Sequence, residues 1–281
     1  KSEAIVAEGH RVFPQVTPRP LNFEYQMAAP FLFEPFSVMK PAAAADAEGK
    51  KKIYADPEFR EAFRARIDGA RKEFKGAFDK TVISQHQKNG ELDEQVLADV
   101  ARERGMKPTD LLLDLALETD LETRFRMPVA NHNEEEVEPL LKSGATVIGL
   151  SDAGAHASQL CDACQPTYFL GRWVREKQTF TIEEAIRMLT SRPAEVAGIM
   201  DRGLLAEGRP ADVAVFDPET VGADGLERVY DFPGGADRLI SKERGMRAVV
   251  VNGTILRENG ADAISPEGNL PGGVLRNGRA A

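Results

Sequence analysis

The sequence of 281 residues contains no run of about 18 apolar residues, so it encodes no membrane-spanning helix. Its two cysteines, Cys161 and Cys164, are too few for a disulfide framework. Three functional signatures are also missing: a GxxxxGKS/T phosphate loop, a GxSxG nucleophile elbow, and histidines spaced as His-x-His or His-x-x-x-His. The net charge of −9 argues against nucleic acid or an anionic membrane surface as a partner.

The remaining composition is that of an ordinary globular protein, with 42% apolar and 29% charged residues. The first residues include no initiator methionine and no apolar signal core, and we therefore expect a cytoplasmic protein. The pattern SEAIVAEG predicts the end of a helix stopped by Gly9, and RVFPQV predicts the strand that follows it. Since the chain starts inside a helix–strand unit, we expect a further portion upstream.

Residues 17–52 are rich in proline and aromatic side chains, which argues against a regular helix or a central strand there. Helical patterns follow. Asp56-Pro57 supplies an N-cap and a first-turn proline, a second helix is marked from Leu92 to Gly105, and a third covers TDLLLDLALE. TVISQ is a short predicted strand between them. We expect residues 30–130 to form a helical insertion, either a lid over a site or a subdomain without that role.

The pattern changes in the second half of the chain. Two capping-box pairs predict helices, Asn133 with Glu136 and Thr181 with Glu184. A short apolar strand is predicted at 145–150. Beyond about residue 203 the pattern is mostly β, with strands at 211–217 and 247–260 and a hairpin turn at Asn252-Gly253. This change predicts a domain boundary near residue 200.

The stretch VIGLSDAGAH places an acid and an imidazole just after the predicted strand 145–150. In parallel α/β folds, catalytic groups are mounted at the carboxyl ends of strands. Asp152 could ligate a divalent metal there and exchange a proton with a water. The alternative is an aspartate that only shapes the turn. His156 could bind substrate, act as an acid or ligate a metal, or it could be an ordinary hydrogen-bonded loop histidine.

A competing interpretation is a small local zinc site. Asp152, His156, Cys161 and Cys164 lie within a short stretch, and all four residue types ligate zinc. Their spacing is not that of a zinc finger or ribbon. The other interpretation of Cys161 and Cys164 is that they are semi-buried cysteines with no special chemistry.

Four segments together resemble the C-terminal part of amidohydrolase-superfamily proteins: GLSDAGAH, FTIEEAIRMLTSRPAEVAGIMDRGLLAEGRPADVAVFDPETV, VVVNGTIL and GGVLR. They are most similar to the N-acyl-D-amino-acid deacylase (D-aminoacylase-like) branch. The resemblance implies an α/β fold, namely a metal-dependent (β/α)8 (TIM) barrel with a small β-sandwich. Residues 1–200 would be the C-terminal portion of the barrel, including the insertion, and residues 201–281 a segment of the sandwich.

The resemblance also implies roles. Asp152 would touch the metal, one or two zinc ions in the parent enzyme, and would shuttle the proton of the attacking water. Gly154 and His156 would lie on the substrate side, and the substrate would be an N-acyl amino acid. The family's His-x-His has no counterpart in this sequence, so we expect the isolated chain to be inactive. We further expect a homo-oligomer or association with a missing N-terminal half. The alternative function is a non-catalytic fragment or subunit that acts only by association.

Overall fold

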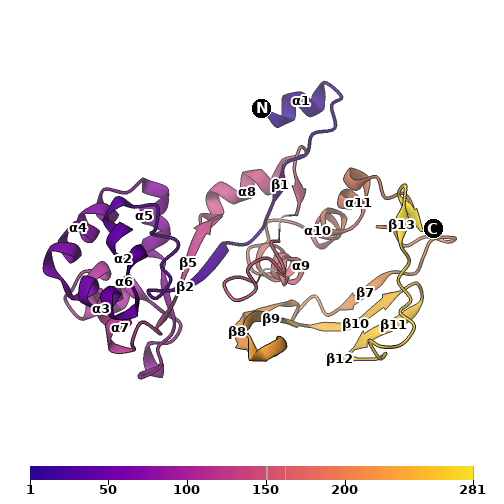
Figure 1. The fold of residues 1–281 in the computed structure, drawn as a ribbon. Helices are drawn as coiled ribbons and strands as arrows, with labels where there is room; N and C mark the ends of the chain where they lie inside the picture. The colour runs from indigo at the N-terminus through magenta and orange to yellow at the C-terminus, as the bar shows by residue number, and fades with distance from the viewer. Residues whose placement is uncertain (150, 162, 281) are drawn as a thin grey trace. The chain divides into compact units, whose positions relative to one another are not determined.

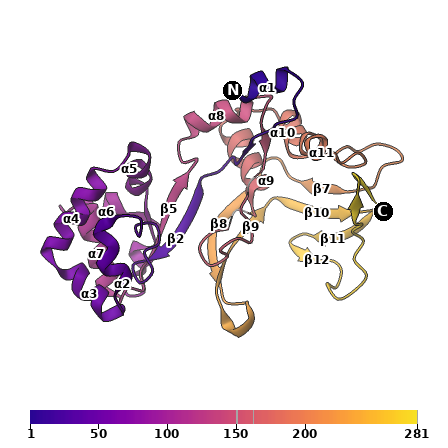
Figure 2. The same ribbon diagram turned by 45° about the horizontal axis from the view of Figure 1, so that its top comes forward.

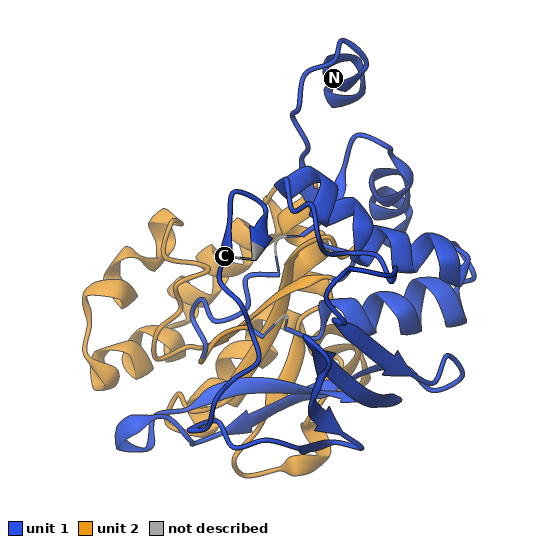
Figure 3. Cartoon of the chain, turned by 90° about the vertical axis from the view of Figure 1, so that its right-hand side faces the viewer, with its two compact units in different colours: residues 1–19, 133–157, 161–281 blue, residues 20–132, 158–160 orange. Residues whose placement is uncertain are grey.

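The computed structural model describes residues 1–149, 151–161 and 163–280, and the chain divides into two compact units. Unit 1 comprises residues 1–19, 133–157 and 161–281, and unit 2 comprises residues 20–132 and 158–160 (Figure 3). Each unit has its own hydrophobic core. The protein is therefore mixed α/β, as the sequence predicts.

Unit 2 combines a four-stranded antiparallel sheet with several short helices (Figure 1). Its strands, in the order β2-β5-β3-β4 across the sheet, are β2 (Leu21–Gln26), β5 (Arg124–Ala130), β3 (Val82–Gln85) and β4 (Gln95–Val96). Its helices are η1 (Ser37–Met39), α2 (Lys40–Ala44), α3 (Ala47–Ala55), α4 (Pro57–Asp68), α5 (Lys72–Asp79), η2 (Gly90–Leu92), α6 (Leu97–Glu103) and α7 (Pro108–Glu118). The core centres on Phe33, which is fully buried and packs edge-on against Tyr25 and Phe63.

Two sequence predictions in unit 2 were wrong. The proline-rich stretch contains helices α2 and α3, because Pro41 lies in the first turn of α2, where its missing N–H costs no hydrogen bond. The helix expected from Leu92 begins only at Leu97, since Leu92 belongs to η2 and Val96 pairs with β3. The predicted cap of α4 is confirmed, because the Asp56 carboxylate accepts from the N–H groups of Glu58 and Phe59.

Unit 1 contains the one parallel strand pair among the described residues, β1 (Gln15–Val16) with β6 (Val147–Ile148). Its helices are α1 (Ser2–Ala7), α8 (Glu134–Lys142), α9 (Gln165–Tyr168), the π-helix η3 (Phe169–Glu176), α10 (Ile182–Leu189), α11 (Ser191–Ala197) and the short η4 (Pro233–Gly235). Val16, Phe169 and Trp173 are among the core residues of this unit. The described residues form no closed barrel. The predicted strand 145–150 is confirmed only at β6, and its last residue, Leu150, lies outside the described residues.

The two predicted helix starts in unit 1 differ in detail. Thr181 and Glu184 form the predicted capping box, with each side chain accepting from the other residue's N–H. Asn133 also caps its helix, but its side chain accepts from the N–H of Glu135 and forms no reciprocal box with Glu136.

The C-terminal part of unit 1 is mostly antiparallel β structure (Figure 2). One sheet has the order β12-β11-β10-β7, with β7 (Val213–Phe216), β10 (Met246–Val251), β11 (Thr254–Glu258) and β12 (Ala261–Asp262). Two further ladders pair β8 (Gly222–Val229) with β9 (Arg238–Arg244), and β13 (Leu275–Arg276) with β14 (Arg279–Ala280). The predicted hairpin turn is confirmed, because Asn252 and Gly253 join β10 to β11 with φ of 46° and 80°.

Candidate active site

The candidate site is on the loop 149–164 between β6 and α9, of which residues 149, 151–161 and 163–164 are described and residues 158–160 belong to unit 2. It follows the carboxyl end of β6, and β6 runs parallel to β1 through bonds from Val147 N–H to Pro14 O and from Gly149 N–H to Val16 O. The carboxyl ends of both strands therefore lie at one edge of this pair, which is the edge where α/β proteins bind ligands.

The three predicted site residues all lie on this loop. Asp152, Gly154 and His156 have φ of 49°, 86° and 45°, and the turn from Asp152 closes with a bond from Ala155 N–H to the Asp152 carbonyl. A left-handed backbone costs a non-glycine residue about 1–2 kcal/mol, so two such residues in one short loop are a notable strain. The Asp152 residue is half-buried, and Gly154 and His156 are exposed.

Two buried polar side chains hold the ends of the loop, and sequence reasoning missed both. Gln165, 5% exposed, donates from Nε2 to the Gly149 carbonyl at 3.1 Å. Arg19, 8% exposed, follows β1 and donates from Nη1 to the Cys161 carbonyl at 3.3 Å and to Cys164 Sγ. The signal available in the sequence was weak, since each is one polar residue beside a proline.

The local zinc site is not formed. Within the part of the chain that the structure describes, no three His, Cys, Asp or Glu side chains are grouped so that they could hold a metal ion. Cys161 is half-buried and Cys164 is buried, and neither forms a disulfide. The burial of the two cysteines agrees with the interpretation of them as semi-buried, and the alternative of a zinc site made by them with Asp152 and His156 was wrong, because these described side chains are not grouped.

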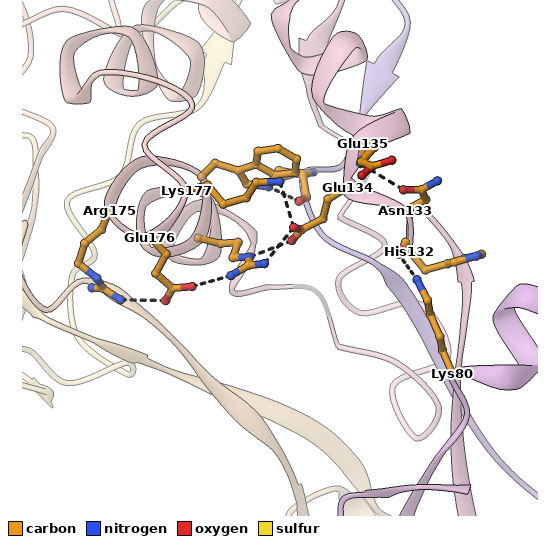
Figure 4. Close-up of polar contacts among 11 residues, drawn as sticks. Lys80, His132, Asn133, Glu134, Glu135, Arg175, Glu176 and Lys177 are labelled. Carbon is orange, nitrogen blue, oxygen red and sulfur yellow. Dashed lines mark hydrogen bonds and ion pairs between the residues drawn. The ribbon is translucent and has the colours of Figure 1, made fainter. Parts of the chain in front are cut away.

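The helices on either side of the loop in the chain, α8 and η3, are joined by an ion-pair network (Figure 4). Both carboxylate oxygens of Glu134 accept from Arg172, at 2.8 and 2.9 Å, and one also accepts from Lys177 at 3.1 Å. These cations, Arg172 before Lys177, lower the pKa of Glu134 below its ordinary value. Next in the helix, Trp173 is fully buried and donates from Nε1 to the Pro18 carbonyl at 2.6 Å, beside Arg19.

Comparison with known proteins identifies the family of this chain. Residues 55–257 match the amidohydrolase family, and the chain therefore belongs to that family. No helix in the described part of the chain is long and apolar enough to cross a membrane.

The chain is similar to two curated proteins of Alcaligenes xylosoxydans xylosoxydans. One is an N-acyl-D-glutamate deacylase, 39% identical over 111 residues, which cover 39% of this chain and 20% of the relative. The other is a D-aminoacylase, 31% identical over 176 residues, which cover 62% of this chain and 33% of the relative. These relatives confirm the predicted resemblance to the N-acyl-D-amino-acid deacylase branch. The chain spans between a fifth and a third of their length.

Among solved structures, the chain is similar to the N-acyl-D-glutamate deacylase of Bordetella bronchiseptica, which was crystallised with zinc and a phosphonate inhibitor. The identity is 24% and the TM-score is 0.45, over 93% of this chain and 44% of that one.

Proposed function

We propose that this chain is part of a hydrolase of amide C–N bonds whose substrates are N-acyl-D-amino acids. The observation that carries the proposal is the position of Asp152, on a strained loop at the carboxyl edge of a parallel strand pair, in a chain of the amidohydrolase family. The two deacylase relatives support the substrate class.

In the proposed reaction, a water oxygen attacks the carbonyl carbon of the acyl group and the C–N bond breaks. Asp152 takes the proton from the water and gives it to the leaving amine nitrogen, so one carboxylate serves first as base and then as acid. The space beside Gly154 is open, since a Cβ built on it would meet nothing within 4 Å, and this supports its position on the substrate side. His156, exposed on the same loop, presents ring nitrogens that could hydrogen-bond the substrate.

The described residues do not fit the zinc ion that the resemblance implies. A catalytic zinc needs three protein ligands, and no three His, Cys, Asp or Glu side chains of the described residues are grouped so that they could hold one together with Asp152. We therefore route no step of the reaction through a metal. If zinc takes part, its other ligands come from residues outside those described here, and we propose that the isolated chain does not turn over substrate.

We also propose the domain organisation that the resemblance implies. Residues 1–200 would be the C-terminal portion of a (β/α)8 barrel with residues 30–130 inserted, and residues 201–281 would contribute to a β-sandwich. The parallel pair β1–β6 supports the first part of this proposal, and the antiparallel sheet β12-β11-β10-β7 supports the second. A cytoplasmic location remains part of the proposal.

The test uses the natural gene product, assayed for amine release from N-acetyl-D-glutamate, N-acetyl-D-methionine and their L-enantiomers. We expect hydrolysis of the D-compounds, and a fall in kcat of about a thousandfold for Asp152→Asn, within the range of general acid–base contributions. The matched control is Asp120→Asn, because Asp120 is also an aspartate with positive φ, at 55°, but lies in unit 2. Failure to hydrolyse any N-acyl amino acid refutes the substrate class, and full activity of Asp152→Asn refutes the role of the acid.

A second candidate, action only through association with another copy or a missing half, is favoured by one observation. In the described residues β6 pairs with β1 alone, and Val147 and Ile148 line a hollow of about 440 Å³ together with Phe180, Arg187 and Met188. An unpaired strand edge beside apolar side chains can accept a further strand. Sedimentation velocity at increasing concentration tests it, and a strictly monomeric chain at all concentrations, alone and with the rest of the gene product, contradicts it.

A further inference from the structure

The two ends of the loop 149–164 are held by a small set of buried polar contacts, all within unit 1. At its start, the Gly149 carbonyl accepts from Gln165, and at its end, Cys161 and Cys164 accept from Arg19. We call Gln165 and Arg19 the loop latch. The latch therefore joins residues that leave β6 to residues that enter α9.

The latch is fixed from behind by the core of unit 1. Gln165 is the first residue of α9, which continues into η3, whose Phe169 and Trp173 are fully buried. Arg19 follows Pro18, whose carbonyl accepts from Trp173. The Arg19 guanidinium also lies over the ring of Tyr168, 5.5 Å from its centroid. Both latch residues thus tie the loop to the buried residues of unit 1, Gln165 through α9 and Arg19 through its contact with Tyr168 and its neighbour Pro18.

Among the described residues of the loop, 151–156 have less support. The bond from Ala155 N–H to Asp152 O and a long contact of 3.4 Å from Ala153 N–H to the Ser151 hydroxyl both lie within the loop. Beyond His156 the loop is tied to strands, because Leu239 N–H donates to Ala157 O at 2.8 Å and Glu24 N–H of β2 donates to Gln159 O at 2.7 Å, and Leu160 is buried. Residues 151–156 contain the strained residues and lie between Gly149, which accepts from Gln165, and Ala157, so they take their position from these two ends.

We propose that Gln165 and Arg19 are positioning residues, which hold the neck of the loop and so determine where the Asp152 carboxylate stands. The claim about catalysis rests on the proposed function, but the claim about loop order does not. Neither latch residue touches the substrate in this proposal. Each acts through the backbone of the loop.

The first experiment is hydrogen–deuterium exchange on the 281-residue chain with Gln165→Met, which keeps side-chain length but cannot donate to Gly149. We expect the amides of residues 151–157 to exchange about tenfold faster, with exchange in α8 and α10 unchanged. The control is Gln87→Met, because Gln87 also donates from Nε2 to a backbone carbonyl, that of Glu122 at 2.7 Å, on the surface of unit 2. Unchanged exchange in 151–157 overturns the latch.

Arg19→Lys provides a second variant if Gln165→Met does not fold. It keeps the charge but cannot contact Cys161 and Cys164 together in the same geometry. Its control is Arg192→Lys, because Arg192 likewise donates to a backbone carbonyl, Gly144 O at 2.8 Å, and lies over the ring of Phe13. Faster exchange of the loop in Arg19→Lys and not in Arg192→Lys is the expected result, and equal effects overturn the proposal.

The catalytic consequence is measured on the natural gene product. Gln165→Met should lower kcat by about tenfold with little change in KM, because the substrate is still bound while the acid is misplaced. A purely structural role would lower the amount of folded enzyme and leave kcat per folded molecule unchanged, and that result overturns the positioning role. If no N-acyl amino acid is hydrolysed at all, the proposed function fails, and the exchange experiment still decides the loop latch.

Discussion

Removal of the Glu134 carboxylate is the sharpest test of how α8 is held to η3. The substitution Glu134→Gln keeps the shape of the side chain but removes the charge that binds Arg172 through two oxygens and Lys177 through one. The amide that replaces it keeps one uncharged oxygen as hydrogen-bond acceptor and places an N–H donor opposite two cations. We expect the free energy of unfolding of unit 1 to fall.

The expected loss of stability depends on how far the ion pair of Glu134 and Arg172 is exposed to solvent. The Glu134 side chain is 26% exposed and Arg172 is 40% exposed, so the pair is screened more than a buried pair and less than a surface pair. Exposed pairs contribute about 0.2–1 kcal/mol and broken buried pairs cost about 3–5 kcal/mol. For a two-oxygen contact of intermediate exposure we expect a loss of about 1.5 kcal/mol.

The assay is urea unfolding followed by tryptophan fluorescence. Trp173 is the one tryptophan of the sequence, it is fully buried in unit 1, and Lys177 Nζ lies 4.6 Å from its ring centroid. The fluorescence therefore follows the part of the molecule that Glu134 stabilises. The matched control is Glu135→Gln, which removes the same charge from the same helix turn at a residue that has no ion pair with a described cation, and it should cost less than about 0.5 kcal/mol.

The dependence on pH separates charge from packing. Because the pKa of Glu134 is lower in the folded protein, its contribution is complete above its ordinary pKa of 4.5 and is lost as the pH falls through the native pKa. The difference between wild type and Glu134→Gln should therefore be constant near pH 7 and shrink towards zero in the acid range. Equal losses for Glu134→Gln and Glu135→Gln, or a difference that persists at low pH, would refute the reasoning.

Three further outcomes are expected. Gly245→Ala should destabilise the chain by about 3 kcal/mol or more, because the new Cβ would lie 2.5 Å from Val221 N. Gly253→Ala, where φ is 80° and the space is open, should cost about 1 kcal/mol, and urea unfolding followed by circular dichroism compares the two variants. Burial raises the pKa of the phenols of Tyr25, Tyr54 and Tyr168. Ultraviolet titration should show Tyr25 and Tyr54 still protonated at pH 11, and stability should fall as the pH rises from the ordinary phenol pKa of 10.0 through the native pKa values; ionisation of all four tyrosines at pH 11 without unfolding would contradict this. Zinc titration against a chromophoric chelator should show no tight binding by the isolated chain and no effect of EDTA on its melting temperature, and a stoichiometric site lost in Asp152→Asn would disprove the ligand argument.

The elements that could be predicted are those whose signals lie within a few residues. Thr181 with Glu184 starts α10, and Asn252-Gly253 turns β10 into β11, as expected. Strand β5 gave no such signal, because Pro128 lies within it. In the structure Pro128 is the register partner of Asn22 in β2, and the pairing of β5 with β3 covers only residues 124–126, so the proline lies where β5 has one strand neighbour.

The candidate site also has residues that local sequence patterns predict and residues that they do not. Asp152, Gly154 and His156 stand next to a short strand, and one stretch of sequence was enough to select them. Arg19 was not found because its hydrogen bond to Cys164 joins positions 145 residues apart. Long-range contacts of this kind are specified by tertiary packing, which local sequence patterns do not contain.

The pairing of β2 with β5 has a consequence for how this chain can change. The long segment of unit 2, residues 20–132, begins with β2 and ends just after β5, and Leu21 is the register partner of Ala130. Entry and exit are therefore about one strand spacing apart, near 5 Å. The two ends of this segment are as close as the ends of a tight hairpin, whatever the number of residues between them. Insertions, deletions or exchange of this whole segment could accumulate without altering the distance that unit 1 must bridge.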